Sequence, residues 1–190
     1  MRPLFVTGNA NKALHMGNLL GIALDHQKLD VDEIQARTAE EVITHKVKQA
    51  YAIAERPVFV DDFSLWLDEL DGLPGPFIKY FIESDGGLEN ICRMADGLAS
   101  RRATARAYFG YYDGTELKII YGEVRGVIAE HPRGRAEWAF GSDPIFAVDG
   151  YGGRTRAELS RDEYDEVYSQ VRAISKVRDF LMEQGGERLA

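Results

Sequence analysis

Three groups of residues, and one separate lysine, have side chains whose types and spacing suit the binding of a phosphate, a metal ion or a nucleobase. The first is the segment Thr7-Gly8-Asn9-Ala10-Asn11-Lys12, where a predicted strand ends and a predicted helix begins. Such a junction exposes free backbone N–H groups and the positive end of the helix dipole, which suits a phosphate. Thr7 and Asn9 add side-chain donors and Lys12 adds a charge, although the spacing is not that of a Walker A loop. A plain turn with an asparagine cap is the alternative, and the residues alone favour it.

The second group is acidic and comprises Glu33, Asp61 and Asp62. Asp61 and Asp62 follow a predicted buried strand over 58–60, so we expect them at its carboxyl end, where open α/β sheets bind ligands. Carboxylates held together are costly unless a cation neutralises them. Hard oxygen ligands beside a phosphate indicate Mg²⁺, whereas a solvated acidic turn is the alternative.

Lys46 stands on the apolar side of a predicted helix over 39–55, four residues from both Val42 and Ala50. A lysine in that place either extends along the apolar surface to solvent or faces a polar cleft. The helix pattern alone favours the solvent alternative.

The third group, Phe140-Gly141-Ser142-Asp143-Pro144, places an aromatic side chain before a constrained loop and a carboxylate. Such a loop can stack on a nucleobase and hydrogen-bond to it, although Asp-Pro is also common in ordinary turns. A rigid segment rich in glycine and proline, residues 72–79, leads into a predicted helix.

An alternation of strands and helices must position these groups. We predict strands over 3–7, 58–60, 103–112, 117–129 and 145–148, and helices over 11–24, 39–55, 76–84, 88–98 and 160–184. Ser160 and Glu163 predict a capping box at the start of the last helix. The mixture indicates an α/β fold with antiparallel strands in the middle.

Length, composition and charge limit the class of protein. The chain has 190 residues, 45% hydrophobic and 28% charged, so we expect a single domain over 1–184 and a frayed tail over 185–190. The net charge of −8 argues against binding of a nucleic-acid polymer. Without a signal peptide or a long apolar run we expect no membrane partner. The single cysteine, Cys92, excludes an internal disulfide, and we expect a cytoplasmic protein.

Taken in order, these segments resemble the inosine/xanthosine triphosphate pyrophosphatase family, which removes deaminated purine nucleotides from the precursor pool. The resemblance rests on the runs 5–12, 60–62, 70–81, 132–134, 140–146 and 155–159. The order and spacing of these runs make it specific, because no single run would.

The resemblance implies a long curved mixed β-sheet with flanking helices that form two lobes around a central cleft. It also implies a homodimer, a nucleoside triphosphate substrate and Mg²⁺. It assigns the triphosphate to Thr7, Asn9, Lys12 and Lys46, the metal to Glu33, Asp62 and Asp61, and the base to Phe140 and Asp143. Asp62 would orient or deprotonate the attacking water, with Lys12 and Lys46 as the other catalytic residues.

Several positions depart from the family pattern. Phe63 stands where the family has a serine or threonine, and Ser142 stands where it has an aromatic residue. In the last helix, Glu163-Tyr164-Asp165 stands in place of a Glu-Lys-Asn run, and Tyr168-Ser169-Gln170 in place of a Ser-His-Arg run. The donors with which the family reads the oxo groups of the base are therefore missing. Tyr164 and Tyr168, one helical turn apart, either pack in the core or wall a reshaped pocket. We include Ser142, Tyr164, Ser169 and Gln170 among the candidate substrate-binding residues.

These observations lead to three functional hypotheses. The first is Mg²⁺-dependent hydrolysis of a nucleoside triphosphate to a monophosphate and pyrophosphate, with a base specificity altered from the family pattern. A site built around hydrogen bonds discriminates by roughly 10⁴ or more, so loss of its donors changes selectivity, whereas the residues for the chemistry remain. The second is house-cleaning hydrolysis of ITP, dITP and XTP. The third is a nucleotide-binding or regulatory protein without catalysis.

Overall fold

The structure, a computed structural model, describes residues 2–186. By its internal contacts the chain forms two compact units. Unit 1 contains the described parts of Met1–Asp62, Ala107–Gly122 and Arg172–Ala190, and unit 2 contains Phe63–Arg106 and Glu123–Val171. Of the predicted tail, residues 187–190 lie outside the described part, while Gly186 still donates a hydrogen bond to the carbonyl of Leu181 at 2.8 Å.

The elements alternate as the sequence predicts. The strands are β1 (Leu4–Val6), β2 (His26–Gln27), β3 (Val58–Leu67), β4 (Pro74–Gly75), β5 (Arg102–Tyr112), β6 (Leu117–Ile128) and β7 (Phe146–Val148). The α-helices are α1 (Ala10–Leu20), α2 (Ala39–Ala54), α3 (Ile78–Glu83), α4 (Gly87–Asp96), α5 (Arg161–Val171) and α6 (Ile174–Glu183), with short 3-10 helices η1 (Asp68–Leu70), η2 (Asp143–Ile145) and η3 (Arg156–Glu158).

The strands form one open mixed sheet. Its order is β2-β1-β3-β5-β6-β7, and β4 pairs with β3 off this path. Strand β1 is parallel to both β2 and β3, whereas the β3–β4 and β6–β7 pairs are antiparallel. The predicted α/β fold with a mixed sheet flanked by helices is confirmed.

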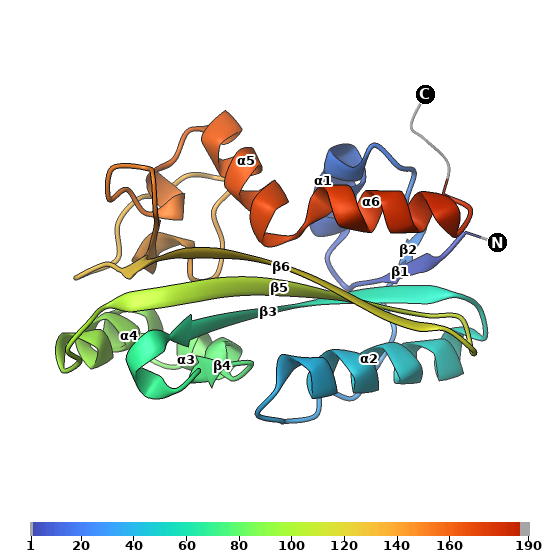
Figure 1. The fold of residues 1–190 in the computed structure, drawn as a ribbon, viewed down its shortest axis with the longest axis horizontal. Helices are drawn as coiled ribbons and strands as arrows, with labels where there is room; N and C mark the ends of the chain where they lie inside the picture. Colours follow the sequence, from blue (N-terminus) through green and yellow to red (C-terminus); the bar gives the residue numbers. More distant parts are fainter. Residues whose placement is uncertain (1, 187–190) are drawn as a thin grey trace. The chain divides into compact units, whose positions relative to one another are not determined.

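In unit 1, helices cover both faces of the sheet. Figure 1 shows α2 on one face and the pair α1 and α6, which contact each other, on the opposite face. Helix α2 forms because Thr38 caps it, its hydroxyl oxygen accepting from the N–H of Glu41 at 3.3 Å, and because its apolar side is buried. Close packing on β5 depends on Gly110, where a Cβ atom would lie 3.0 Å from Cγ1 of Ile43.

In unit 2, β4 and β7 extend the same sheet. Leu65 of β3 pairs with Gly75, and Val127 of β6 pairs with Ala147. Helices α3 and α4, which contact each other, lie on one face of this part of the sheet, and α5 lies on the other (Figure 1). The structure confirms the predicted capping box of α5, since the N–H groups of Ser160 and Glu163 each bond to the other residue's side chain.

Three predicted boundaries are wrong. The helix expected over 11–24 ends at Leu20, where Gly21 adopts a left-handed conformation with φ of 65°. The expected single helix over 160–184 is two helices, α5 and α6, because Ala173 adopts a left-handed conformation with φ of 47°. The expected strand over 58–60 is longer, and β3 continues to Leu67. No helix within residues 2–186 is both long and apolar enough to cross a membrane.

We expect Gly110→Ala to destabilise the protein. The new methyl group would lie 3.0 Å from Cγ1 and 3.3 Å from the carbonyl oxygen of Ile43, so α2 must move away from the sheet. Overpacking of this kind costs about 1–3 kcal/mol of unfolding free energy, measured by urea denaturation. The matched control is Gly97→Ala, whose methyl group would have only the carbonyl of Met94 within 4 Å, at 3.7 Å. Equal stabilities of the two variants would contradict the packing argument.

Candidate functional site

The segment between β1 and α1 holds the first group of predicted residues in a local hydrogen-bond network. Asn9 caps α1, because its side-chain oxygen accepts from the N–H of Lys12 at 3.0 Å, while its own N–H donates to the hydroxyl oxygen of Thr7 at 3.2 Å. The asparagine cap expected as the structural alternative is therefore present. The first turn of α1 contains no acidic residue, so no carboxylate of the helix itself opposes an anion at this end; the Asp61 carboxylate of β3 lies 2.6 Å from Nζ of Lys12.

Asp61 and Asp62 lie in the middle of β3, not at its end as predicted. The strand continues to Leu67, with Ser64, Leu65 and Leu67 buried. The parallel pairing of Phe5 with Phe59 ends β1 before it reaches the two aspartates, which leaves them beside the segment that follows β1. Because side chains alternate along a strand, the two carboxylates point to opposite faces of the sheet.

Asp61 is a buried ion-pair centre. Its carboxylate is 5% exposed, and Oδ2 lies 2.6 Å from Nζ of Lys12 and 2.6 Å from Nη1 of Arg172. These partners come from α1 and from the residues between α5 and α6, on the side of the sheet where α1 and α6 lie (Figure 1). The pair joins segments that are 111 residues apart in the sequence.

The electrostatics of this centre favour its charged form. Burial alone would raise the pKa of Asp61, but Lys12 and Arg172 outweigh burial and hold that pKa well below its usual range. Burial lowers the pKa of Lys12, although Asp61 opposes the shift. A carboxylate with two close cations is already neutralised, so Asp61 has little need of a metal ion.

Asp62 faces a different set of neighbours. Nζ of Lys46, on α2, lies 4.0 Å from Oδ1 of Asp62 and 3.7 Å from Oε1 of Glu33, and it donates to the carbonyl of Asp61 at 3.2 Å. The Lys46 side chain is only 16% exposed, so it faces a polar cluster instead of solvent. Burial raises the pKa of Asp62 to about 6, Asp61 and Glu33 also raise it, and Lys46 opposes them.

The Glu33 and Asp62 carboxylates suit a divalent cation. Their side chains are 46% and 24% exposed, within reach of solvent and ligands. Magnesium is commonly held by one or two carboxylates, with substrate phosphates and water completing its shell. No group of three or more histidine, cysteine or acidic residues that could hold a metal occurs in the described part of the chain. These two carboxylates therefore suit only a cation whose other ligands are substrate phosphates and water.

The base-side residues of unit 2 divide into exposed and buried ones. Phe140 is 51% exposed, whereas Ser142 and Asp143 are 3% and 2% exposed. Asp143 folds back on its own loop, because Oδ2 accepts from the N–H of Phe140 at 2.9 Å. The aromatic ring is therefore presented to the outside while the carboxylate points inward.

Asp143 has two further partners. The Tyr164 hydroxyl donates to its Oδ2 at 2.9 Å, and Nη1 of Arg156 lies 2.8 Å from its Oδ1. Burial, and then the adjacent Asp143 carboxylate, raise the pKa of Tyr164 far above its usual range, so the hydroxyl stays a donor. The guanidinium of Arg156 also lies 5.0 Å from the centroid of the Tyr164 ring. Both oxygens of Asp143 are thus engaged within unit 2.

The remaining predicted residues lie on α5. Tyr164 and Tyr168 are each 1% exposed, and their ring centroids are 6.0 Å apart, which matches the core-packing alternative. Ser169 is half-buried and Gln170 is exposed, with its side chain donating to Glu166 at 3.4 Å.

Sequence reasoning missed two arginines, Arg156 and Arg172, which are 3% and 2% exposed. Each pairs with a buried aspartate, Arg156 with Asp143 and Arg172 with Asp61. An arginine within an apolar stretch, such as Arg172 between Val171 and Ile174, is the one signal that points to a buried pair. This signal does not identify the acidic residue with which the arginine pairs.

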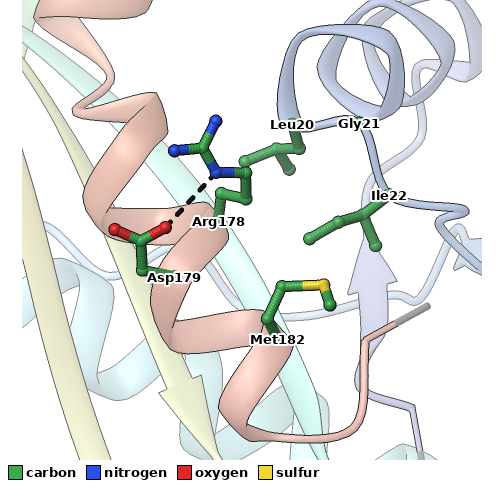
Figure 2. A pocket seen from close by; sticks show the side chains of 6 residues that line it. All are labelled: Leu20, Gly21, Ile22, Arg178, Asp179 and Met182. Carbon is green, nitrogen blue, oxygen red and sulfur yellow. Dashed lines mark hydrogen bonds and ion pairs between the residues drawn. The ribbon is translucent and has the colours of Figure 1, made fainter. Parts of the chain in front are cut away.

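A separate cavity of about 650 Å³ lies in unit 1 near the end of α1. Figure 2 shows its lining, which comprises Leu20, Gly21, Ile22, Arg178, Asp179 and Met182. None of the predicted site residues lines it.

Comparison with known proteins agrees with the geometry. The model of the Ham1 family matches residues 4–180. An inosine triphosphate pyrophosphatase of Emericella nidulans is 37% identical over 184 residues, covering 95% of this chain and 96% of that protein. A dITP/XTP pyrophosphatase of Thermococcus kodakarensis is 35% identical over 186 residues, covering 96% and 98%.

Among solved structures, a HAM1 protein from Coxiella burnetii superposes with a TM-score of 0.81 at 23% identity, covering 95% of this chain and 98% of that one. At that identity the likeness concerns the fold alone. The sequence relatives and the matched model carry the assignment of family, and they confirm the resemblance found in the motifs: this chain belongs to the Ham1 family.

Proposed function

We propose that this protein hydrolyses nucleoside triphosphates to monophosphates and pyrophosphate, and that the triphosphates of inosine and xanthosine are its substrates. The observation that carries the chemistry is the cluster in which Lys46 lies within 4.0 Å of the Glu33 and Asp62 carboxylates. Support for the substrates comes from relatives that are named for ITP and for dITP/XTP and align over nearly the whole chain.

The phosphate roles belong to residues of unit 1. Lys12 and Lys46 supply the positive charge for the outer phosphates, and the capped start of α1, with Thr7 and Asn9, supplies N–H and hydroxyl donors. Lys12 is held by Asp61 at 2.6 Å, so its ammonium is already ordered before an anion binds. Asp61, expected in the metal set, takes this supporting role instead.

Glu33 and Asp62 are the proposed ligands of Mg²⁺. When bound, the ion neutralises charge that develops on the phosphate oxygens. The pKa of Asp62, raised to about 6 by burial and further by Asp61 and Glu33, expresses the cost of holding this carboxylate charged in its place, a cost that a cation would reduce.

Asp62 also orients the attacking water and accepts its proton. The water oxygen forms a bond to the α-phosphorus, and the bond from that phosphorus to the bridging oxygen breaks. Pyrophosphate leaves with the electron pair. The Asp62 carboxylate, whose pKa is about 6, is ionised at physiological pH and can accept this proton.

A second candidate is the same reaction on a different base. The observation that favours it is the pair of tyrosines on α5, each 1% exposed, where the family pattern has polar donors. The named relatives outweigh it, so we assign the house-cleaning function. We also propose a homodimer, which rests on the family resemblance, and a cytoplasmic location, which rests on the single cysteine.

Asp62→Asn should lower kcat by roughly 10²- to 10⁴-fold, because the amide can neither accept the proton nor bind the cation as strongly. The measurement is pyrophosphate release with purified protein and Mg²⁺. Asp179→Asn, at a residue whose side chain is 70% exposed on α6, is the matched control and should retain wild-type activity. A fully active Asp62→Asn variant would exclude this residue from the mechanism.

Glu33→Gln should raise the Mg²⁺ concentration needed for half-maximal activity. Loss of a residue that supports a metal ligand costs about 10- to 100-fold in affinity, and loss of a ligand should cost at least as much. The measurement is a Mg²⁺ titration of activity at saturating substrate. Glu40→Gln, an exposed acidic residue of α2, is the control, and identical titrations for both variants would remove Glu33 from the site.

A panel of natural and deaminated NTPs and dNTPs should show the highest kcat/KM with ITP, dITP and XTP. The assay is pyrophosphate release, with Asp62→Asn as the blank. Preference for another base would support the altered-specificity hypothesis. Nucleotide binding without release of pyrophosphate from any member would instead support the non-catalytic hypothesis.

A further inference from the structure

The loop that carries Phe140 is attached to the turn at η3 by a partly exposed ion pair, Nε of Arg133 with Oε2 of Glu158 at 3.3 Å, and by three further contacts. The Thr155 hydroxyl donates to the carbonyl of Arg133 at 3.0 Å. The N–H of Ala136 donates to the carbonyl of Ala157 at 3.3 Å. The third contact is the ion pair of Arg156 with Asp143.

The third of these contacts carries charge and, unlike the ion pair of Arg133 with Glu158, it is deeply buried. The side chains of Arg156 and Asp143 are 4% and 2% exposed. A buried carboxylate without a cation is strongly unfavourable. Tyr164, the other side chain that bonds to Asp143, is neutral, so compensation of the charge comes from Arg156.

The backbone of this region is shaped for the pair. Gly134 has φ of 81°, and a Cβ atom there would lie 2.3 Å from the carbonyl oxygen of Ala157. Such close approach is open to glycine alone. The irregular segment after Arg133 can therefore lie directly against η3, where Arg156 pairs with Asp143.

Through Asp143 the ion pair reaches the exposed aromatic ring. Oδ2 of Asp143 accepts from the N–H of Phe140 at 2.9 Å, while Oδ1 pairs with Arg156 at 2.8 Å. The carboxylate, with both oxygens engaged, has little capacity left for a ligand. Phe140 is 51% exposed, and it is the part of the loop that can meet a base.

We infer that Arg156 is a positioning residue for base binding: by holding Asp143 in a buried ion pair, it fixes the loop that presents the Phe140 ring. This inference rests on the proposed function for its ligand, a nucleobase recognised through its face. Asp143 then acts inside the protein instead of reading the edge of the base.

The test combines kinetics with a spectroscopic signal from the loop itself. The chain has two tryptophans, and Trp66→Phe leaves Trp138, two residues before Phe140, as the single emitter. In this background Arg156→Met should shift the Trp138 emission to longer wavelength as the loop is released. KM should rise by about tenfold or more with kcat changed by less than about threefold, because binding is lost and the chemical step is kept.

Arg156→Lys keeps a cation and should recover part of both signals. The control is Arg102→Met, which removes an exposed ion pair with Asp149 in the same unit and should leave KM and emission unchanged. Wild-type emission and wild-type KM in Arg156→Met would overturn the inference.

If Arg156→Met does not fold, the double variant Asp143→Leu/Arg156→Met replaces it, since an apolar pair of similar volume often preserves stability. It should be folded, show the shifted Trp138 emission and have the raised KM. A folded double variant with wild-type values would overturn the inference. If the wild-type protein hydrolyses no nucleotide, the proposed function fails, and the emission of the Arg156 variants then decides the positioning role alone.

Discussion

The buried carboxylate of Asp61 is the interaction on which unit 1 depends. Moving a carboxylate out of water costs several kcal/mol, and removing one partner of a buried pair costs about 3–5 kcal/mol. Here the cost is offset by two cations, Lys12 and Arg172, each 2.6 Å from the same oxygen. Because these cations come from α1 and from Arg172, between α5 and α6, one side chain in β3 holds three segments together. Lys12, the proposed phosphate-binding lysine, is thereby ordered by the core of the fold.

Unit 2 uses the same device for a different purpose. Asp143 is buried, and its cation, Arg156, is also buried. In unit 1 the pair orders a charged donor, Lys12, whereas in unit 2 it orders an uncharged ring, Phe140. Chemistry on phosphate needs charge, while recognition of a base by its face needs a flat apolar surface held at a fixed place. One unit thus provides a charged group and the other an apolar ring, and a buried ion pair supports each of them.

The features that could be predicted from the sequence were those set by neighbours along the chain. Helix α2 is predictable because its apolar residues repeat at helical spacing. The end of β3 is not predictable, because two adjacent aspartates suggest a turn, yet the lysines and the arginine that compensate them come from other segments. The break at Ala173 is not predictable either, because alanine favours a helix, whereas here it adopts a left-handed conformation. The roles of Arg156 and Arg172 require partners that are far away in sequence, so no local pattern reveals them.

Because Asp61 and Asp62 occupy consecutive positions of β3, their surroundings depend on which positions of the strand face each side of the sheet. Asp61 and Asp62 are neighbours in sequence, but the alternation of the strand gives one to the face with α1 and the other to the face with α2. A single residue inserted or deleted between Val58 and Asp61 would exchange their faces. Asp61 would then point away from its two cations, Lys12 and Arg172, and Asp62 would point to the face with α1. The composition of the strand would be almost unchanged while its electrostatic order was reversed. The different surroundings of the two aspartates therefore depend on which positions of β3 face each side of the sheet.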